Sequence, residues 1–159
     1  MTVIARITIS LFLILTATAN FAVAATRYVE KWGTDAVGPC VKSNPCFEIG
    51  TAIDVSGKND RIVVGPGTYT ETGLSIQPPR EGLRLESTAG RHATTIVSGD
   101  GGSVLAIEAI RVRVGKKGKG FTLIGATNFP SNAGININVP EEFAGIRIEG
   151  NRIGRPRSS

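Results

Sequence analysis

From Arg61 onward, apolar and polar residues alternate in very short runs. The runs read RIVVG, LSIQP, LRLES, TIVSG, VLAIE, IRVRVG, FTLIGA, GININV and GIRIEGNRI, and Gly, Pro, Asn or Asp separates most of them. Alternation with a period of two predicts half-buried strands rather than amphipathic helices. Upstream, the pattern predicts one short strand, about Arg27 to Lys31, and one short helix, about Phe47 to Val55, which Ser56-Gly57 ends.

The first of these runs is interrupted by Gly-Pro-Gly in the stretch IVVGPGTYTE. A hairpin turn would normally carry Asn-Gly or Asp-Gly. Glycine permits positive φ and proline fixes its own φ, so residues 65–67 predict a corner where the chain bends and continues as a second strand. In that arrangement Ile62 and Val64 point inward and Val63 outward, or the reverse if the register shifts by one residue.

Apolar residues also recur at a longer spacing that is typical of a repeat protein. Ile62, Leu83 and Leu105 lie 21 and 22 residues apart, and Leu74, Ile96 and Phe121 form a less regular second series. Imperfect repeats in this range are typical of solenoids. A β-sandwich also has short strands, but strands this short that are linked by corners favour a parallel stack of about three coils.

Residues 1–24 have the composition of a secretory signal peptide. One positive charge, Arg6, precedes an apolar run from Ile7 to Leu15, and the small residues Ala22-Val23-Ala24 follow. This order predicts cleavage after Ala24 and export to the periplasm, the cell surface or the medium. A membrane anchor is the alternative, but the apolar run is shorter than the roughly 20 residues that span a bilayer.

Charge and cysteine content narrow the range of partners. The chain carries a formal net charge of +5, which favours anionic partners. Its basic residues are not interleaved with aromatic ones, so we do not expect a nucleic-acid partner. Cys40 and Cys46 enclose a short loop, and in an oxidising compartment this pair predicts a disulfide. Two thiols and the distant His92 do not make a zinc site, and no other metal site is predicted.

The segment RYVEKWGTDAVGPC…NPCFEIGTAIDVSGKNDRIVVGPGTY resembles the N-terminal entry of right-handed parallel β-helix proteins of the pectin-lyase-like superfamily, and GFTLIGA…GININV…GIRIEGNRI is similar to their repeats. The resemblance implies an all-β fold, a right-handed parallel β-helix of about three coils with a short N-terminal capping helix. The expected divisions are a signal peptide (1–24), a strand, disulfide loop and capping helix (25–60), and coils (61–159). No capping element follows the last repeat, so the chain is expected to be the N-terminal portion of a longer or truncated β-helix.

This superfamily contains lyases, hydrolases, epimerases and adhesins, so the fold does not decide the function. Its lyases and hydrolases need a carboxylate cluster, often with Ca²⁺, and a base. The Asp-Pro-His-Asp run of the epimerases and the paired aspartates of the polygalacturonases are both missing. The sequence therefore identifies no catalytic residue and leaves Ca²⁺ open without a supporting motif. A polysaccharide lyase or hydrolase remains an alternative function.

Several polar residues have an ordinary structural explanation beside a functional one. Asp100, in SGDGGS, suits a turn as well as a cation site. His92 is either a loop residue or a general base, and the lysines of GKKGKG (115–120) form either a solvated turn or a glycan contact. Asn151 is expected to form hydrogen bonds between coils.

The arginines offer the best candidate binding face. Arg111 and Arg113 alternate with apolar residues, which predicts that both lie on one side of a strand, and Arg84 lies between two leucines and should face outward with Arg80 and Arg91. If these arginines stack across coils, their guanidinium groups match carboxylates bidentately; scattered surface arginines are the alternative. We predict that Arg84, Arg111 and Arg113 bind an acidic polysaccharide or cell-surface glycan. A structural or adhesive repeat protein is a further alternative.

Overall fold

The computed structural model describes residues 23–36, 38–125, 134–140 and 145–154, which form three parallel β-sheets and one short helix. The first sheet contains β1 (Thr26–Val29), β2 (Arg61–Val64), β5 (Arg84–Ser87), β8 (Arg113–Val114) and β11 (Arg147–Ile148). The second contains β3 (Gly67–Glu71), β6 (Thr94–Ser98), β9 (Thr122–Ile124) and β12 (Arg152–Gly154). The third contains β4 (Ser75–Ile76), β7 (Leu105–Ile107) and β10 (Ile135–Ile137).

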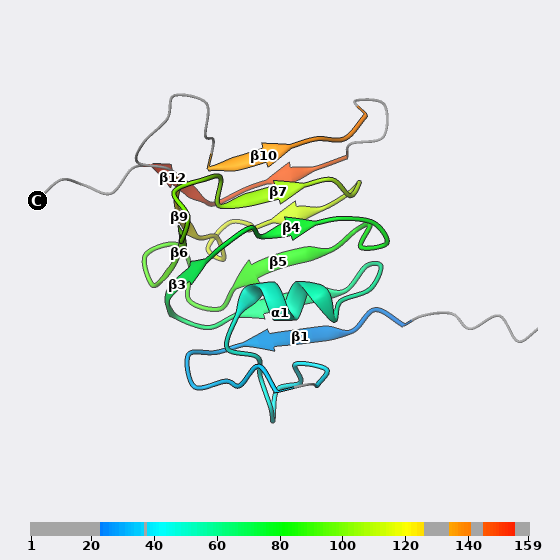
Figure 1. The fold of residues 1–159 in the computed structure, drawn as a ribbon, viewed down its shortest axis with the longest axis vertical. Coiled ribbons are helices and arrows are strands. Elements are labelled where there is room, and N and C mark those ends of the chain that lie inside the picture. Colours follow the sequence, from blue (N-terminus) through cyan, green and yellow to red (C-terminus); the bar gives the residue numbers. More distant parts are fainter. Residues whose placement is uncertain (1–22, 37, 126–133, 141–144, 155–159) are drawn as a thin grey trace, which may run out of the picture.

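Successive strands visit the three sheets in turn, so the chain winds as a stack of coils. Strands β2, β3 and β4 make one coil, β5, β6 and β7 the next, and β8, β9 and β10 the third, after which β11 and β12 continue the first two sheets. Each strand pairs in parallel with its equivalent in the neighbouring coil. Figure 1 shows this stack, with β1 near one end and β10 at the other. The predicted all-β stack of short parallel strands is confirmed.

The Gly-Pro-Gly corner lies where the sequence predicts it. Strand β2 ends at Val64 in the first sheet, and β3 begins at Gly67 in the second. Both glycines are also required by a close neighbour. A Cβ on Gly65 would overlap the carboxylate of Glu30, and a Cβ on Gly67, which has a φ of 141°, would approach the Lys31 side chain to 2.7 Å. Any larger residue at either position would displace the chain that follows β1.

The core runs along the inside of the stack as columns of equivalent residues. Ile62 pairs with Leu85, Leu85 with Val114, and Val114 with Ile148. Ile62, Leu85 and Val114 are fully buried. Val64 also belongs to the core cluster, so Ile62 and Val64 point inward as predicted. Val63 lies outside that cluster, although it is only 8% exposed. Burial of each such aliphatic side chain contributes about 1.5 to 3 kcal/mol, so stacking between coils is the main source of stability.

This register corrects the predicted repeat. Leu85, and not Leu83, lies opposite Ile62, and Leu105 belongs to the third sheet. The second predicted series fails for the same reason, because Ile96 pairs with Tyr69 and Leu123 in the second sheet. The coils therefore have unequal lengths, and the register is kept by strand pairing and not by a fixed period.

The helix α1 (Ile49–Asp54) lies near the end of the stack that carries β1, and it contacts β1, β2, β3 and β4. It is shorter than predicted, and its buried face is Ile49, Ala52 and Ile53. The predicted bounds were too wide at both ends, and Phe47 and Val55, the predicted first and last residues, are exposed. No helix among the described residues is long and apolar enough to cross a membrane.

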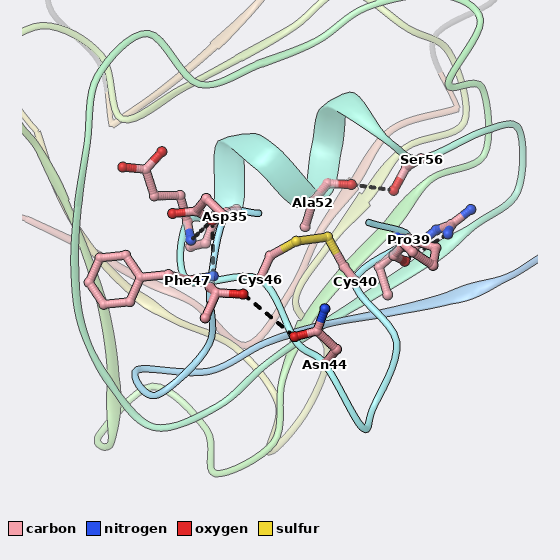
Figure 2. Close-up of a disulfide and its surroundings, with 12 residues drawn as sticks. Asp35, Pro39, Cys40, Asn44, Cys46, Phe47, Ala52 and Ser56 are labelled. Carbon is pink, nitrogen blue, oxygen red and sulfur yellow. Dashed lines mark hydrogen bonds between the residues drawn. A yellow bond between two sulfur atoms is a disulfide. The ribbon is translucent and has the colours of Figure 1, made fainter. Parts of the chain in front are cut away.

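The predicted disulfide between Cys40 and Cys46 is present, with the two Cα atoms 5.0 Å apart. Figure 2 shows it beside α1, and both cysteines are buried within the core cluster. Asp35 accepts hydrogen bonds from the backbone N–H groups of Phe47 and Glu48, just before the helix, both at 3.0 Å. The disulfide loop and the aspartate therefore fix the chain where it enters α1.

Candidate functional site

A column of arginines runs up the outer face of the first sheet. Arg61 pairs with Arg84, Arg84 with Arg113, and Arg113 with Arg147 in the parallel register. Neighbouring strands of a sheet lie about 4.8 Å apart, so the four backbone positions repeat at that interval along the stack. We call these four residues the arginine ladder. Arg84 and Arg113, two of the candidates from the sequence, therefore occupy equivalent positions on adjacent strands, and Arg61 and Arg147 extend the row.

The turn before each of these strands is built in the same way. Two residues before each ladder arginine the backbone has a positive φ: 63° at Asn59, 74° at Gly82, 59° at Arg111 and 50° at Gly145. These turn residues approach one another closely in two pairs, because a Cβ on Gly82 would overlap the Asn59 side chain and one on Gly145 would lie 3.1 Å from Cγ of Arg111. Large and small residues therefore alternate along the column of turns.

This alternation hollows the surface beside the ladder. A depression of about 240 Å³ is lined by Asn59, Gly82, Arg84, Arg111 and Arg113. All three arginines that the sequence singled out therefore border one concavity. Arg111 reaches it from the turn before β8, which corrects the prediction that it shares a strand face with Arg113.

At one end of the ladder, Arg61 forms an ion pair within the protein. Nη2 of Arg61 lies 2.8 Å from a carboxylate oxygen of Glu86, and Nζ of Lys116 lies 3.3 Å from the same oxygen. Burial by itself raises the pKa of Glu86, but the hydrogen bond and charge of Arg61, followed by those of Lys116, outweigh burial and hold that pKa below its ordinary value. Within the described part of the chain, Arg84, Arg113 and Arg147 have no ion-pair partner.

Replacing Glu86 with glutamine should weaken the fold and strengthen attraction for anions. Because the folded-state pKa is lowered from 4.5, the stability that Glu86 contributes is present above that pH and is lost as the pH falls through the folded-state pKa. We expect Glu86→Gln to cost about 1 kcal/mol at pH 7, allowing for solvent screening of the part-exposed cations, and progressively less as the pH falls through the folded-state pKa. Urea denaturation at a series of pH values measures the difference, and a loss that does not change with pH would contradict this account.

Arg111 occupies a backbone conformation that is uncommon for a residue other than glycine or asparagine. Such outliers cost about 1 to 3 kcal/mol and are concentrated at functional sites. Replacing Arg111 with glycine should therefore raise the free energy of unfolding by about 0.5 to 1 kcal/mol. This net gain is the relief of backbone strain minus the cost of the larger entropy that glycine has in the unfolded chain. It should also lower polyanion affinity. Thermal melting and a binding titration on the same sample check both, and a loss of stability would show that Arg111 is not strained.

Two other predicted arginines do not belong to this face. Arg80 donates hydrogen bonds to the backbone carbonyls of Ile53 at 2.6 Å and Asp54 at 3.0 Å, so it satisfies the end of α1. Arg91 lines a separate depression of about 330 Å³. The other residues that line it are Ala89, Gly90, His92, Lys117, Gly118 and Gly150. The five candidate arginines therefore lie in three places: Arg84, Arg111 and Arg113 beside the ladder, Arg91 at a separate basic depression, and Arg80 at the end of α1.

The acidic candidates are used by the protein itself. The carboxylate of Asp100 accepts hydrogen bonds from Oγ of Ser98 at 2.7 Å and the backbone N–H of Gly102 at 2.9 Å, as expected of a turn residue. A larger cleft, about 450 Å³, adjoins α1, but its buried Glu71 accepts hydrogen bonds from the first two backbone N–H groups of that helix. Among the residues that the structure places, no three His, Cys, Asp or Glu side chains are grouped to hold a metal ion.

Asn151 has the structural role that the sequence predicts. Its side chain accepts a hydrogen bond from the backbone N–H of Phe121 at 2.8 Å and donates one to the carbonyl of Val114 at 2.7 Å. It therefore connects the fourth coil to both ends of the turn between β8 and β9. This connection supports the strand that carries Arg113.

Comparison with known proteins gives no assignment for this geometry. No family model matches the chain, and no curated protein or solved structure matches it either. The ladder and its surroundings are therefore the features that bear on function.

Sequence reasoning missed two ladder residues, Arg61 and Arg147. The signal was present as four short segments, NDRIV, GLRLE, RVRVG and GIRIE, which align with arginine at the third position of each. The first position of each segment is the positive-φ turn residue. Alignment of these segments, instead of the apolar residues alone, would have given the register of the first sheet.

Proposed function

We propose that this chain is an exported right-handed parallel β-helix module of the pectin-lyase-like kind that binds an acidic polysaccharide along the arginine ladder. The observation that carries the proposal is the pairing of Arg84 with Arg113 and of Arg113 with Arg147 on adjacent strands. Three exposed guanidinium groups in one line present a repeated positive charge. A linear polymer with one carboxylate per sugar residue presents a repeated negative charge.

The chemistry of the ladder favours carboxylates on a chain over isolated anions. Guanidinium groups bind carboxylates through two parallel hydrogen bonds, and a regular row of them can engage several groups of one polymer at once. Arg111 and the depression at Gly82 add a concavity beside the row. A sugar ring can lie in such a concavity while its carboxylate meets Arg84 or Arg113.

A binding panel tests this function. Immobilised polygalacturonate, alginate and a neutral glucan are titrated with the disulfide-oxidised protein at low and at physiological salt. We expect binding to both polyuronates, weaker binding at higher salt because exposed charges are screened, and no binding to the neutral glucan. Equal retention on all three polymers would refute the proposal. Absorbance of newly formed unsaturated uronate ends, followed in the same samples, would instead reveal a lyase.

A further inference from the structure

A buried carboxylate lies at the end of the stack where the described chain begins. Asp60 is only 3% exposed and directly precedes β2. It accepts hydrogen bonds from the backbone N–H of Gly57 at 3.0 Å and from Nε and Nη2 of Arg27 at 3.3 and 3.2 Å. Its shortest hydrogen bond, 2.6 Å, comes from the backbone nitrogen of Ala25. Four donors therefore converge on one carboxylate, and one of them is the backbone of the residue just before β1.

Ala25 is also the point at which the chain joins the first sheet. Its carbonyl accepts a hydrogen bond from the backbone N–H of Arg61 at 2.8 Å, and the side chain is half-buried. Immediately upstream, Ala24 is exposed and Val23 is 88% exposed. The Ala24–Ala25 peptide bond thus separates exposed residues from Ala25, whose backbone nitrogen and carbonyl are both hydrogen-bonded to the fold. The same bond follows the small residues of Ala22-Val23-Ala24, where signal cleavage is expected.

We propose that cleavage of the Ala24–Ala25 bond leaves the new α-amino group of Ala25 bound to Asp60. Hydrolysis adds one water across the peptide bond, so the C–N bond breaks, the carbonyl carbon of Ala24 becomes a carboxylate and the nitrogen of Ala25 becomes an ammonium group. A nitrogen that donated as a neutral amide then donates as a cation. Charge-assisted hydrogen bonds are about twice as strong as neutral ones, so processing strengthens an existing contact without moving the chain.

The position of Asp60 gives this contact a structural consequence. Asp60 lies between Asn59, the first positive-φ turn residue, and Arg61, the first residue of the ladder. Its backbone carbonyl also accepts a hydrogen bond from Arg84 N–H at 3.0 Å. Holding Asp60 therefore fixes the turn before β2, and its carbonyl connects that turn to the first residue of β5. The mature amino terminus thus forms an ion pair with the Asp60 carboxylate, and Arg27 is the second cation that contacts this carboxylate.

The first test identifies the terminus. The full chain is expressed in an exporting bacterial host, and the purified protein is analysed by intact mass and N-terminal sequencing. We expect Ala25 as the first residue. Any other single start site would overturn the proposal, because the amino group would then not lie at Asp60.

The second test measures the contact. Protein starting at Ala25 is compared with protein carrying one extra glycine before Ala25, which has the same charge but moves the amino group by one residue. We expect the extended form to melt roughly 3 to 8 °C lower, and this difference to vanish in the Asp60→Asn background. Equal melting temperatures of the two wild-type forms would overturn the proposal. If Asp60→Asn does not fold, the acylation rate of the Ala25 α-amino group decides: at least tenfold slower in folded than in urea-unfolded protein is expected, and equal rates would overturn it.

Discussion

Replacing both Arg84 and Arg113 with alanine is expected to weaken binding to polygalacturonate about 100-fold. Each side chain is exposed, belongs to the ladder and borders the depression beside it. A charge-assisted hydrogen bond contributes about 1.5 kcal/mol or more, so the loss of two such contacts gives about 3 kcal/mol. Exposed substitutions of this kind change stability by less than about 0.5 kcal/mol, so the fold should persist. Titration and thermal melting of the same preparation measure the two effects separately.

The control for this experiment removes the same charge elsewhere. Lys42 lies in the disulfide loop and Arg152 in β12 of the second sheet, and both are exposed. The double variant Lys42→Ala, Arg152→Ala should keep most of the affinity. A third variant with lysine at both ladder positions should bind with intermediate affinity, because lysine keeps the charge but not the planar fork. If the two alanine variants lose affinity equally, net charge and not the ladder attracts the polymer.

Replacing Leu85 with alanine is expected to lower the free energy of unfolding by about 3 kcal/mol. Leu85 is fully buried in β5, next to Arg84, and lies between Ile62 of the coil below and Val114 of the coil above. Truncating a buried leucine to alanine loses the free energy of transferring the removed atoms from water to the core. It also leaves a cavity, because the paired strands of neighbouring coils cannot move closer together to fill it. In a solenoid each coil contacts its neighbours only, so a cavity in the middle coil weakens both of its interfaces. Urea denaturation measures the loss.

Ile153 supplies the matched control, because it is an aliphatic residue in β12 and is 53% exposed. Its replacement by alanine should cost less than about 0.5 kcal/mol. The Leu85→Ala variant should also bind polyuronate less tightly at temperatures where its coils begin to separate. A loss below 1 kcal/mol for Leu85→Ala would mean that the coils are not held together mainly by their stacked core.

The fold class could be predicted because two local signals were strong. Short alternating runs indicated strands too brief for a sandwich, and the Gly-Pro-Gly corner appears between β2 and β3 as expected. The disulfide followed from the close spacing of Cys40 and Cys46. Each of these features depends on neighbouring residues, so composition and spacing were sufficient to find them.

The register could not be predicted from apolar spacing, for a physical reason. Leu83 and Leu85 are both fully buried, and a period of two does not distinguish which of them lies opposite Ile62. All three sheets face one core, so Leu105 has the same apolar character as a residue of the first sheet. The ladder depends on this register, which explains why Arg84 and Arg113 were found while Arg61 and Arg147 were missed.

The unequal coil lengths separate distance along the sequence from distance along the stack. Ladder arginines grow farther apart in the chain from Arg61 to Arg147, yet they remain on consecutive strands at about 4.8 Å. The spacing between ladder arginines is thus constant along the stack. The number of arginines that one long polymer can contact depends on the number of coils. Gain or loss of a whole coil changes that number by one, while growth of a loop leaves it unchanged.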